Sequence, residues 1–91
     1  MMLQLKLEGL CCTLWDGEVP CASMRFSFTD EKIVLSPAKI ERTIPGLDAE
    51  DALSRTILSA ALERKFQKAK LPDGGEIDIP DFFGEKSCGG D

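Results

Sequence analysis

The chain has no histidine and no tyrosine, and its 91 residues include one tryptophan. Histidine is the side chain that most often transfers a proton near neutral pH, and it is a common zinc ligand, so its absence excludes the most frequent catalytic and zinc-binding arrangements. No serine stands in a GxSxG setting, and the carboxylates and lysines are scattered through expected turns and helix ends. The sequence therefore predicts a protein that is not an enzyme, with no catalytic residues and no cofactor.

Long apolar runs are also missing. A membrane-spanning helix needs about 18 or more apolar residues in succession, and residues 1–10, MMLQLKLEGL, alternate leucines with polar residues where a signal peptide would be continuously apolar. We therefore expect no membrane association and a cytoplasmic location, where thiols are usually reduced.

The cysteines contain no CxxC pair. A metal site made of all of them would need Cys88 to fold back onto the others, and adjacent cysteines on a strand point to opposite faces. We predict no metal ligands and four free thiols, most of them buried as small apolar side chains. A small cysteine-based metal or thiol protein is the alternative, and its residues would be Cys11, Cys12, Cys21 and Cys88.

The composition is that of a folded domain, with 43% hydrophobic and 30% charged residues. We expect a single domain over residues 1–84 and a frayed tail over residues 85–91, which has little to bury. The net charge of −5 argues against a nucleic-acid surface, since phosphate binding requires a local excess of lysine and arginine. It favours solubility and basic partners.

Residues 48–70 are predicted to form one long helix. Asp48 can cap the start, acidic residues follow it in the first turn, and no glycine or proline interrupts the segment. At about 100° per residue the helix carries two apolar stripes on roughly opposite sides. The first contains Leu53, Ile57, Ala60 and Ala61, and the second contains Leu58, Leu62, Phe66 and Ala69. The second stripe needs a cover, which could come from the C-terminal segment or from another chain.

The other segments indicate strands. Leu3, Leu5 and Leu7 alternate with polar residues, and Gly9 is expected to be a bulge within a strand that continues to residue 15. Residues 16–20 are expected to form a loop longer than the two-residue hairpin type, before a returning strand over residues 21–29. Further strands are predicted over residues 32–36 and 76–79, with residues 39–44 either a fourth strand or an extended connection.

These elements predict an α+β fold in the order β-β-β-α-β. An antiparallel sheet of three to four strands is packed on one long α-helix, with a short C-terminal edge strand. We expect the main core layer to form between the helix residues Leu53 and Ile57 and one face of the sheet, made of Leu3, Leu5, Leu7, Ala22, Met24, Phe26 and Phe28.

A nucleic-acid-associated regulator is a second alternative. Its basic residues would be Arg64, Lys65, Lys68 and Lys70, although cations also complement the C-terminal end of a helix for structural reasons. The strand and helix order, with DAEDAL at the helix start and IDIP at the end of the last strand, is similar over residues 47–80 to the HicB-like antitoxin domain. That topological resemblance implies an antitoxin-like regulator and assigns no residue a role.

We hypothesise a small, non-enzymatic protein–protein interaction or regulatory module. Its partner would be another protein chain or a second copy, in a homodimer built on the helix or on an exposed sheet edge. The hypothesis is based on surplus apolar surface, which usually marks an interface. The candidate protein-binding residues are Trp15, Leu58, Leu62, Phe66, Phe82 and Phe83. In the alternative interpretation, the C-terminal apolar residues fold back over the helix within one chain.

Overall fold

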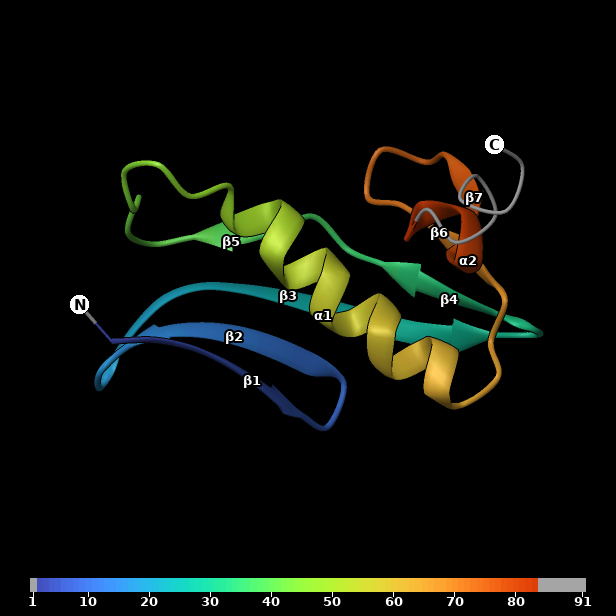
Figure 1. Ribbon diagram of the computed structural model, residues 1–91, viewed down its shortest axis with the longest axis horizontal. Coiled ribbons are helices and arrows are strands. Elements are labelled where there is room, and N and C mark those ends of the chain that lie inside the picture. Colours follow the sequence, from blue (N-terminus) through green and yellow to red (C-terminus); the bar gives the residue numbers. More distant parts are fainter. Residues whose placement is uncertain (1, 84–91) are drawn as a thin grey trace.

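The computed structural model of the protein describes residues 2–83, which form a mixed sheet of seven strands and two helices (Figure 1). The predicted α+β class is confirmed, but the sheet is larger than the three to four strands expected. In chain order the elements are β1 (Leu3–Glu8), β2 (Cys11–Asp16), β3 (Val19–Thr29), β4 (Lys32–Leu35), β5 (Lys39–Ile40), α1 (Ala49–Glu63), β6 (Lys68–Lys70), β7 (Glu76–Asp78) and α2 (Ile79–Phe82). In this part of the chain no helix is long and apolar enough to cross a membrane.

The first four strands form an antiparallel meander joined by tight loops. Each loop has two residues, and the first of them has a positive φ angle: 58° at Gly9, 62° at Gly17 and 54° at Asp30. Two expectations were therefore wrong. Gly9 lies in a hairpin turn rather than in a bulge, so the predicted first strand is two strands. The loop after Asp16 is also short, and a bulge at Cys21 absorbs the extra residue instead.

The rest of the sheet is built on β3 and β4. The short strand β5 pairs with the same edge of β3 as β4 does, and Pro37 lies between β4 and β5. After α1 the chain returns as β6, which runs parallel to β4, and β7 then pairs antiparallel to β6 at the end of the sheet. The sheet is consequently mixed rather than purely antiparallel, because a helix connects β4 to β6. The predicted C-terminal edge strand is confirmed as β7.

The helix is shorter than predicted, because α1 ends at Glu63 instead of reaching residue 70. The amide of Phe66 donates to the carbonyl of Ala61 at 3.0 Å, the amide of Lys65 donates to Leu62 at 2.9 Å, and Lys65 has a φ angle of 70°. This is the Schellman arrangement of a helix end, with lysine where glycine is usual. It turns the chain so that residues 68–70 form β6.

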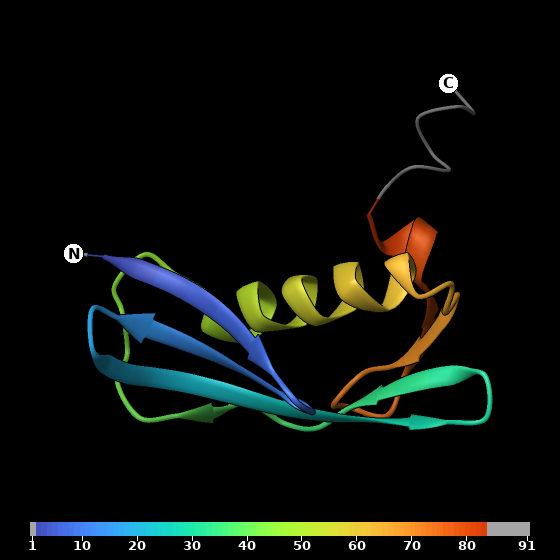
Figure 2. The same ribbon diagram turned by 90° about the horizontal axis from the view of Figure 1, so that it is seen from below.

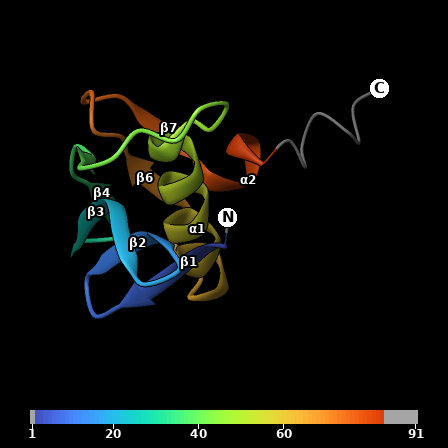
Figure 3. The same cartoon turned by 90° about the vertical axis from the view of Figure 1, so that its left-hand side faces the viewer.

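One face of the sheet packs against α1 and forms the core. Figures 2 and 3 show α1 lying along this face while the strands curve around it. Leu53 and Ile57 are fully buried there, as expected, and Met24 is only 1% exposed. Ser54 is buried beside them, with its hydroxyl 3.7 Å from the Met24 sulfur. The sheet side of this core consists of Cys12, Leu14, Ala22, Met24, Phe26, Ile33, Leu35 and Ala69.

The second apolar stripe of the helix is covered from within the chain. Leu58 and Ile79 are both fully buried, and α2 contacts α1. Phe66 and Ala69 lie beyond the end of the helix, and Ala69 is buried in β6. Of the predicted second stripe, Leu58 and Ala69 are buried and Leu62 and Phe66 are partly buried, but Phe66 and Ala69 are not part of the helix.

Candidate functional site

Strand β1 lies at the end of the sheet opposite β7 (Figure 1). One of its sides pairs with β2 along its whole length of six residues, and no strand within residues 2–83 pairs with the other side. All six residues are exposed. An edge strand of this kind presents a series of unpaired backbone donors and acceptors, to which a further strand can bind.

The direction of the unpaired groups follows from the pairing with β2. The amide of Gly17 donates to the carbonyl of Met2 at 2.9 Å, and hydrogen-bonded pairs alternate along an antiparallel ladder. Gln4, Lys6 and Glu8 therefore form bonded pairs with β2. The amides and carbonyls of the other three residues, which we call the leucine row, point toward the open side: Leu3, Leu5 and Leu7.

The side chains of the leucine row lie on the same face of the sheet as the core. Leu5 stands opposite Leu14 and Leu7 stands opposite Cys12, and both of these partners are buried. The leucine row was expected to be buried under the helix. The exposed fractions are instead 39% at Leu3, 39% at Leu5 and 41% at Leu7, because β1 is the end strand of the sheet. Apolar surface is thus joined to free backbone groups on one edge.

This edge has little protection against pairing with another chain. Proteins usually protect an edge strand by lysine, proline, a bulge or shortness. β1 contains no proline, its register with β2 is continuous, and its one lysine, Lys6, has its ammonium 5.7 Å from the centre of the Trp15 ring. That contact draws the charge toward β2 and away from the open side.

The strand at the opposite edge of the sheet, β7, differs from β1 in length and charge. β7 has three residues, two of them acidic, and Pro80 follows closely. Glu76 forms an ion pair with Lys32 at 2.8 Å and Asp78 forms one with Lys68 at 3.0 Å. These hydrogen-bonded pairs lower the pKa of Glu76 and raise the pKa of Lys68. A short, charged strand of this kind is a poor template for strand addition.

The six predicted protein-binding residues are not brought together. Trp15 is half-buried on the sheet face opposite α1, beside β1. Leu58 is fully buried and offers no surface to a partner in this structure, while Leu62 packs partly buried against the core. Phe66 stacks on Phe28, with ring centres 4.8 Å apart.

The two remaining aromatics of that set lie in α2 and just after it. Phe82 and Phe83 make an edge-to-face pair with centres 5.3 Å apart, and the Arg55 guanidinium lies 5.0 Å from the Phe82 ring. Both rings are partly buried against the core. An exposed sheet edge was one of the expected interfaces, but the alternating leucines did not identify it as β1, because periodicity does not say which strands have a neighbour.

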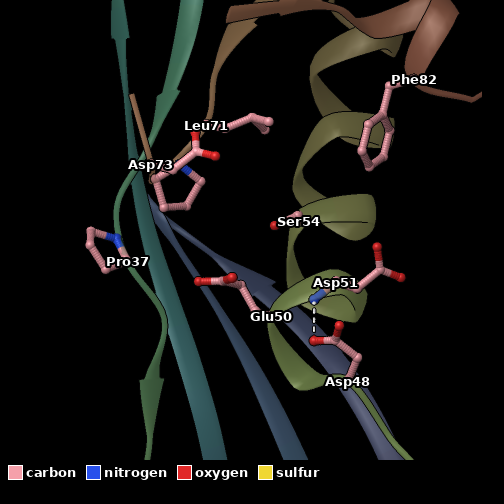
Figure 4. Close-up of a pocket in the computed structure, with 9 residues that line it drawn as sticks. Pro37, Asp48, Glu50, Asp51, Ser54, Leu71, Asp73 and Phe82 are labelled. Atoms are coloured by element: carbon pink, nitrogen blue, oxygen red, sulfur yellow. Dashed lines mark hydrogen bonds between the residues drawn. The ribbon is translucent and has the colours of Figure 1, made fainter. Parts of the chain in front are cut away.

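A hollow of about 410 Å³ lies between the start of α1 and the segment before β7 (Figure 4). Asp48, Glu50, Asp51 and Asp73 give it an acidic rim. One Asp48 carboxylate oxygen accepts the Asp51 amide at 3.1 Å and so caps the helix, and Glu50 and Asp51 point in different directions. Within residues 2–83 no three acidic or cysteine side chains are grouped to hold a metal ion. Asp48, Glu50 and Asp51 lie at the helix start, where negative charge is favourable, and the Asp73 carboxylate accepts the amide of Gly75 at 2.9 Å.

The cysteines that the structure describes are unpaired. Cys12 and Cys21 are fully buried and Cys11 is half-buried. Burial, and to a smaller extent the neighbouring Cys11 thiol, raises the pKa of Cys12 to about 11, which makes it a poor nucleophile. Cys88, which the thiol or metal alternative also requires, lies outside the described residues, as does the expected tail over residues 85–91.

The basic cluster is divided between two elements. Arg64 and Lys65 close α1, where the Arg64 guanidinium lies 5.9 Å from the centre of the Phe28 ring. Lys68 and Lys70 lie in β6, and Lys68 is bound by Asp78. The four cations therefore do not form one helical surface.

Comparison of the chain with models of protein families, with curated proteins and with solved structures finds no match.

Proposed function

We propose that this protein is a small, non-enzymatic interaction module that binds a partner protein by adding a β-strand to the open edge of β1. The observation that carries the proposal is the coincidence of two features on one strand. The outward backbone groups of Leu3, Leu5 and Leu7 have no partner strand within residues 2–83, and the same residues present exposed apolar side chains. Strand addition uses both, since main-chain bonds provide affinity and alternate side chains provide specificity.

Of the two surfaces expected from the sequence, the helix and a sheet edge, the sheet edge is the better binding surface. Leu58 is buried and the C-terminal segment covers its side of α1, whereas Trp15 keeps a role at the edge. Its ring holds the Lys6 ammonium at 5.7 Å, on the face away from the leucine row. A partner strand can then approach the open side without displacing Lys6. Displacing a solvated lysine would reduce the binding free energy.

Leu5 offers a selective test, because its amide points outward. Proline at position 5 removes that donor without removing a hydrogen bond between β1 and β2, and proline is tolerated on an edge strand when its nitrogen faces solvent. Leu5→Val is the matched control, since it keeps the amide and the β-branched side chain suits a strand. Circular dichroism and thermal unfolding establish that both variants are folded.

The measurement is affinity purification of the tagged chain from its own host cells, followed by mass spectrometry. We expect a protein, additional copies of this chain included, to be recovered in near-stoichiometric amount with the unchanged chain and with Leu5→Val. Recovery should fall about tenfold with Leu5→Pro, a loss of about 1.4 kcal/mol in binding. Equal recovery with all three forms, or no recovered protein at all, would contradict the proposed function.

A further inference from the structure

We infer that the strand added to β1 belongs to a second copy of this chain, paired antiparallel so that Leu5 of one copy stands directly opposite Leu5 of the other. This inference rests on the proposed function and names its partner. The two copies would be related by a twofold axis through Leu5, as in most homodimers. The sheets of the two copies would then continue into one another.

The backbone geometry allows this pairing. In it, Leu3 stands opposite Leu7 of the second copy and Leu5 opposite Leu5, so every outward-pointing residue of the leucine row forms a hydrogen-bonded pair. Each such pair exchanges two bonds, and the interface would contain about six. Opposed residues share a face of the sheet, so the two leucine rows also meet side by side and cover one another on the core side.

The two registers with an axis nearer the C-terminal end of β1 are worse. An axis at Lys6 places the two Lys6 residues, which carry like charges, directly opposite each other, and like charges in opposed positions destabilise a strand pair. An axis at Leu7 places Leu5 opposite Gly9, where the strand has already turned at a φ angle of 58°. With the axis at Leu5, Lys6 stands opposite Gln4 and no two like charges are opposed. Charge and the length of the strand thus favour the axis at Leu5 over the axes at Lys6 and Leu7.

The charge of the strand also favours a second copy over a charged partner. β1 carries one cation and one anion, Lys6 and Glu8, so it has no net charge although the chain has a net charge of −5. A basic partner would find no excess of acid on this edge. Two acidic copies repel weakly at long range, and salt screens that repulsion within about 10 Å at 0.1 M. Self-association should therefore strengthen as salt is added, whereas association with a basic partner would weaken.

Sedimentation of the purified full chain tests the inference. The mass should rise from 10.0 kDa toward twice that value with concentration, and the dissociation constant should fall between low salt and about 0.1 M salt. Leu5→Pro should raise the dissociation constant about tenfold or more, and Leu5→Val, which keeps the outward amide, should raise it much less. A chain that stays monomeric at millimolar concentration, or a dimer unaffected by Leu5→Pro, overturns the inference.

Disulfide cross-linking tests the register independently of stability. Opposed residues in a bonded antiparallel pair have Cα atoms about 5.5 Å apart, within the range that a disulfide spans. In a chain carrying Cys11→Ser and Cys88→Ser, Leu5→Cys should give a covalent dimer on mild oxidation. Leu3→Cys and Leu7→Cys should give little dimer alone and a covalent dimer when mixed. A covalent dimer from Leu7→Cys alone, or none from Leu5→Cys, contradicts this register.

The two proposals fail in different ways. A monomeric purified chain that nevertheless recovers another protein through the Leu5 amide overturns the self-pairing and keeps the proposed function. A chain that neither dimerises nor recovers any protein through this amide overturns both.

Discussion

The backbone amide of Phe66 donates to the carbonyl oxygen of Ala61, 3.0 Å away, and this bond closes α1. Between them Lys65 has a φ angle of 70°, a conformation that glycine adopts freely and that a side chain disfavours. This turn ends the helix and directs the chain back so that β6 can pair with β4. Lys65, the residue at the turn, therefore has a strained backbone conformation.

We expect Lys65→Gly to stabilise the protein. Glycine removes the cost of the left-handed backbone conformation, about 1–2 kcal/mol. It also raises the conformational entropy of the unfolded chain, which offsets part of this gain in stability. The net increase in the free energy of unfolding should be about 0.5–1 kcal/mol, measured by urea denaturation. Lys65→Ala is the control, because it removes the charge and keeps the strain. Equal effects of the two changes would show that charge, not backbone conformation, is responsible.

Leu58→Ala should strongly destabilise the isolated chain. Leu58 is a fully buried residue of α1 within the core cluster, and replacing it with alanine leaves a cavity. Such changes cost about 2–5 kcal/mol. Leu10→Ala, at a residue that is 51% exposed, should change the free energy of unfolding by about 0.5 kcal/mol or less. A small effect at Leu58 would mean that its side of the helix is open in solution.

The ion pair between Lys32 and Glu76 should make stability depend on pH in the acid range. Lys32 donates to Glu76 at 2.8 Å and lowers the pKa of that carboxyl in the folded state. The contribution is complete above the ordinary pKa of glutamate and is lost as the pH falls through the lowered value.

Unfolding experiments on Lys32→Gln at neutral and acid pH measure this dependence. The variant should be less stable than the unchanged chain at neutral pH, and the difference should vanish in acid. Lys39→Gln is a control of equal charge, since its pair with Glu41 is longer, at 3.9 Å, and exposed. A difference that persists after Glu76 is protonated would assign the effect to the lysine stem rather than to the pair.

Alkylation should distinguish the adjacent cysteines. Cys12 is fully buried and its pKa is raised to about 11, so little thiolate forms at mildly alkaline pH. Cys11 is half-buried on the opposite face of β2. Limited treatment with iodoacetamide at about pH 8, followed by peptide mapping, should modify Cys11 well before Cys12. The two cysteines should be alkylated at similar rates only after the protein is unfolded in urea. Similar alkylation rates of Cys11 and Cys12 in the native protein would contradict the burial of Cys12.

The sequence determined the local elements of this protein. Asp48 marked the helix start, since a capping carboxylate and a following run without glycine or proline leave few other conformations. The alternating leucines of β1 were likewise readable, because strand periodicity is a short-range property.

The tertiary structure alone decided which surfaces remain open. Phe66 and Ala69 continue the helical pattern in sequence, yet pairing of β6 with β4 takes them out of the helix, since tertiary contacts outweigh helix propensities of a few tenths of a kcal/mol per residue. Leu58 was expected to be available to a partner but is fully buried, and Leu5 was expected to be buried but is exposed on the end strand of the sheet. Burial depends on neighbours distant along the chain, and local periodicity carries no information about them.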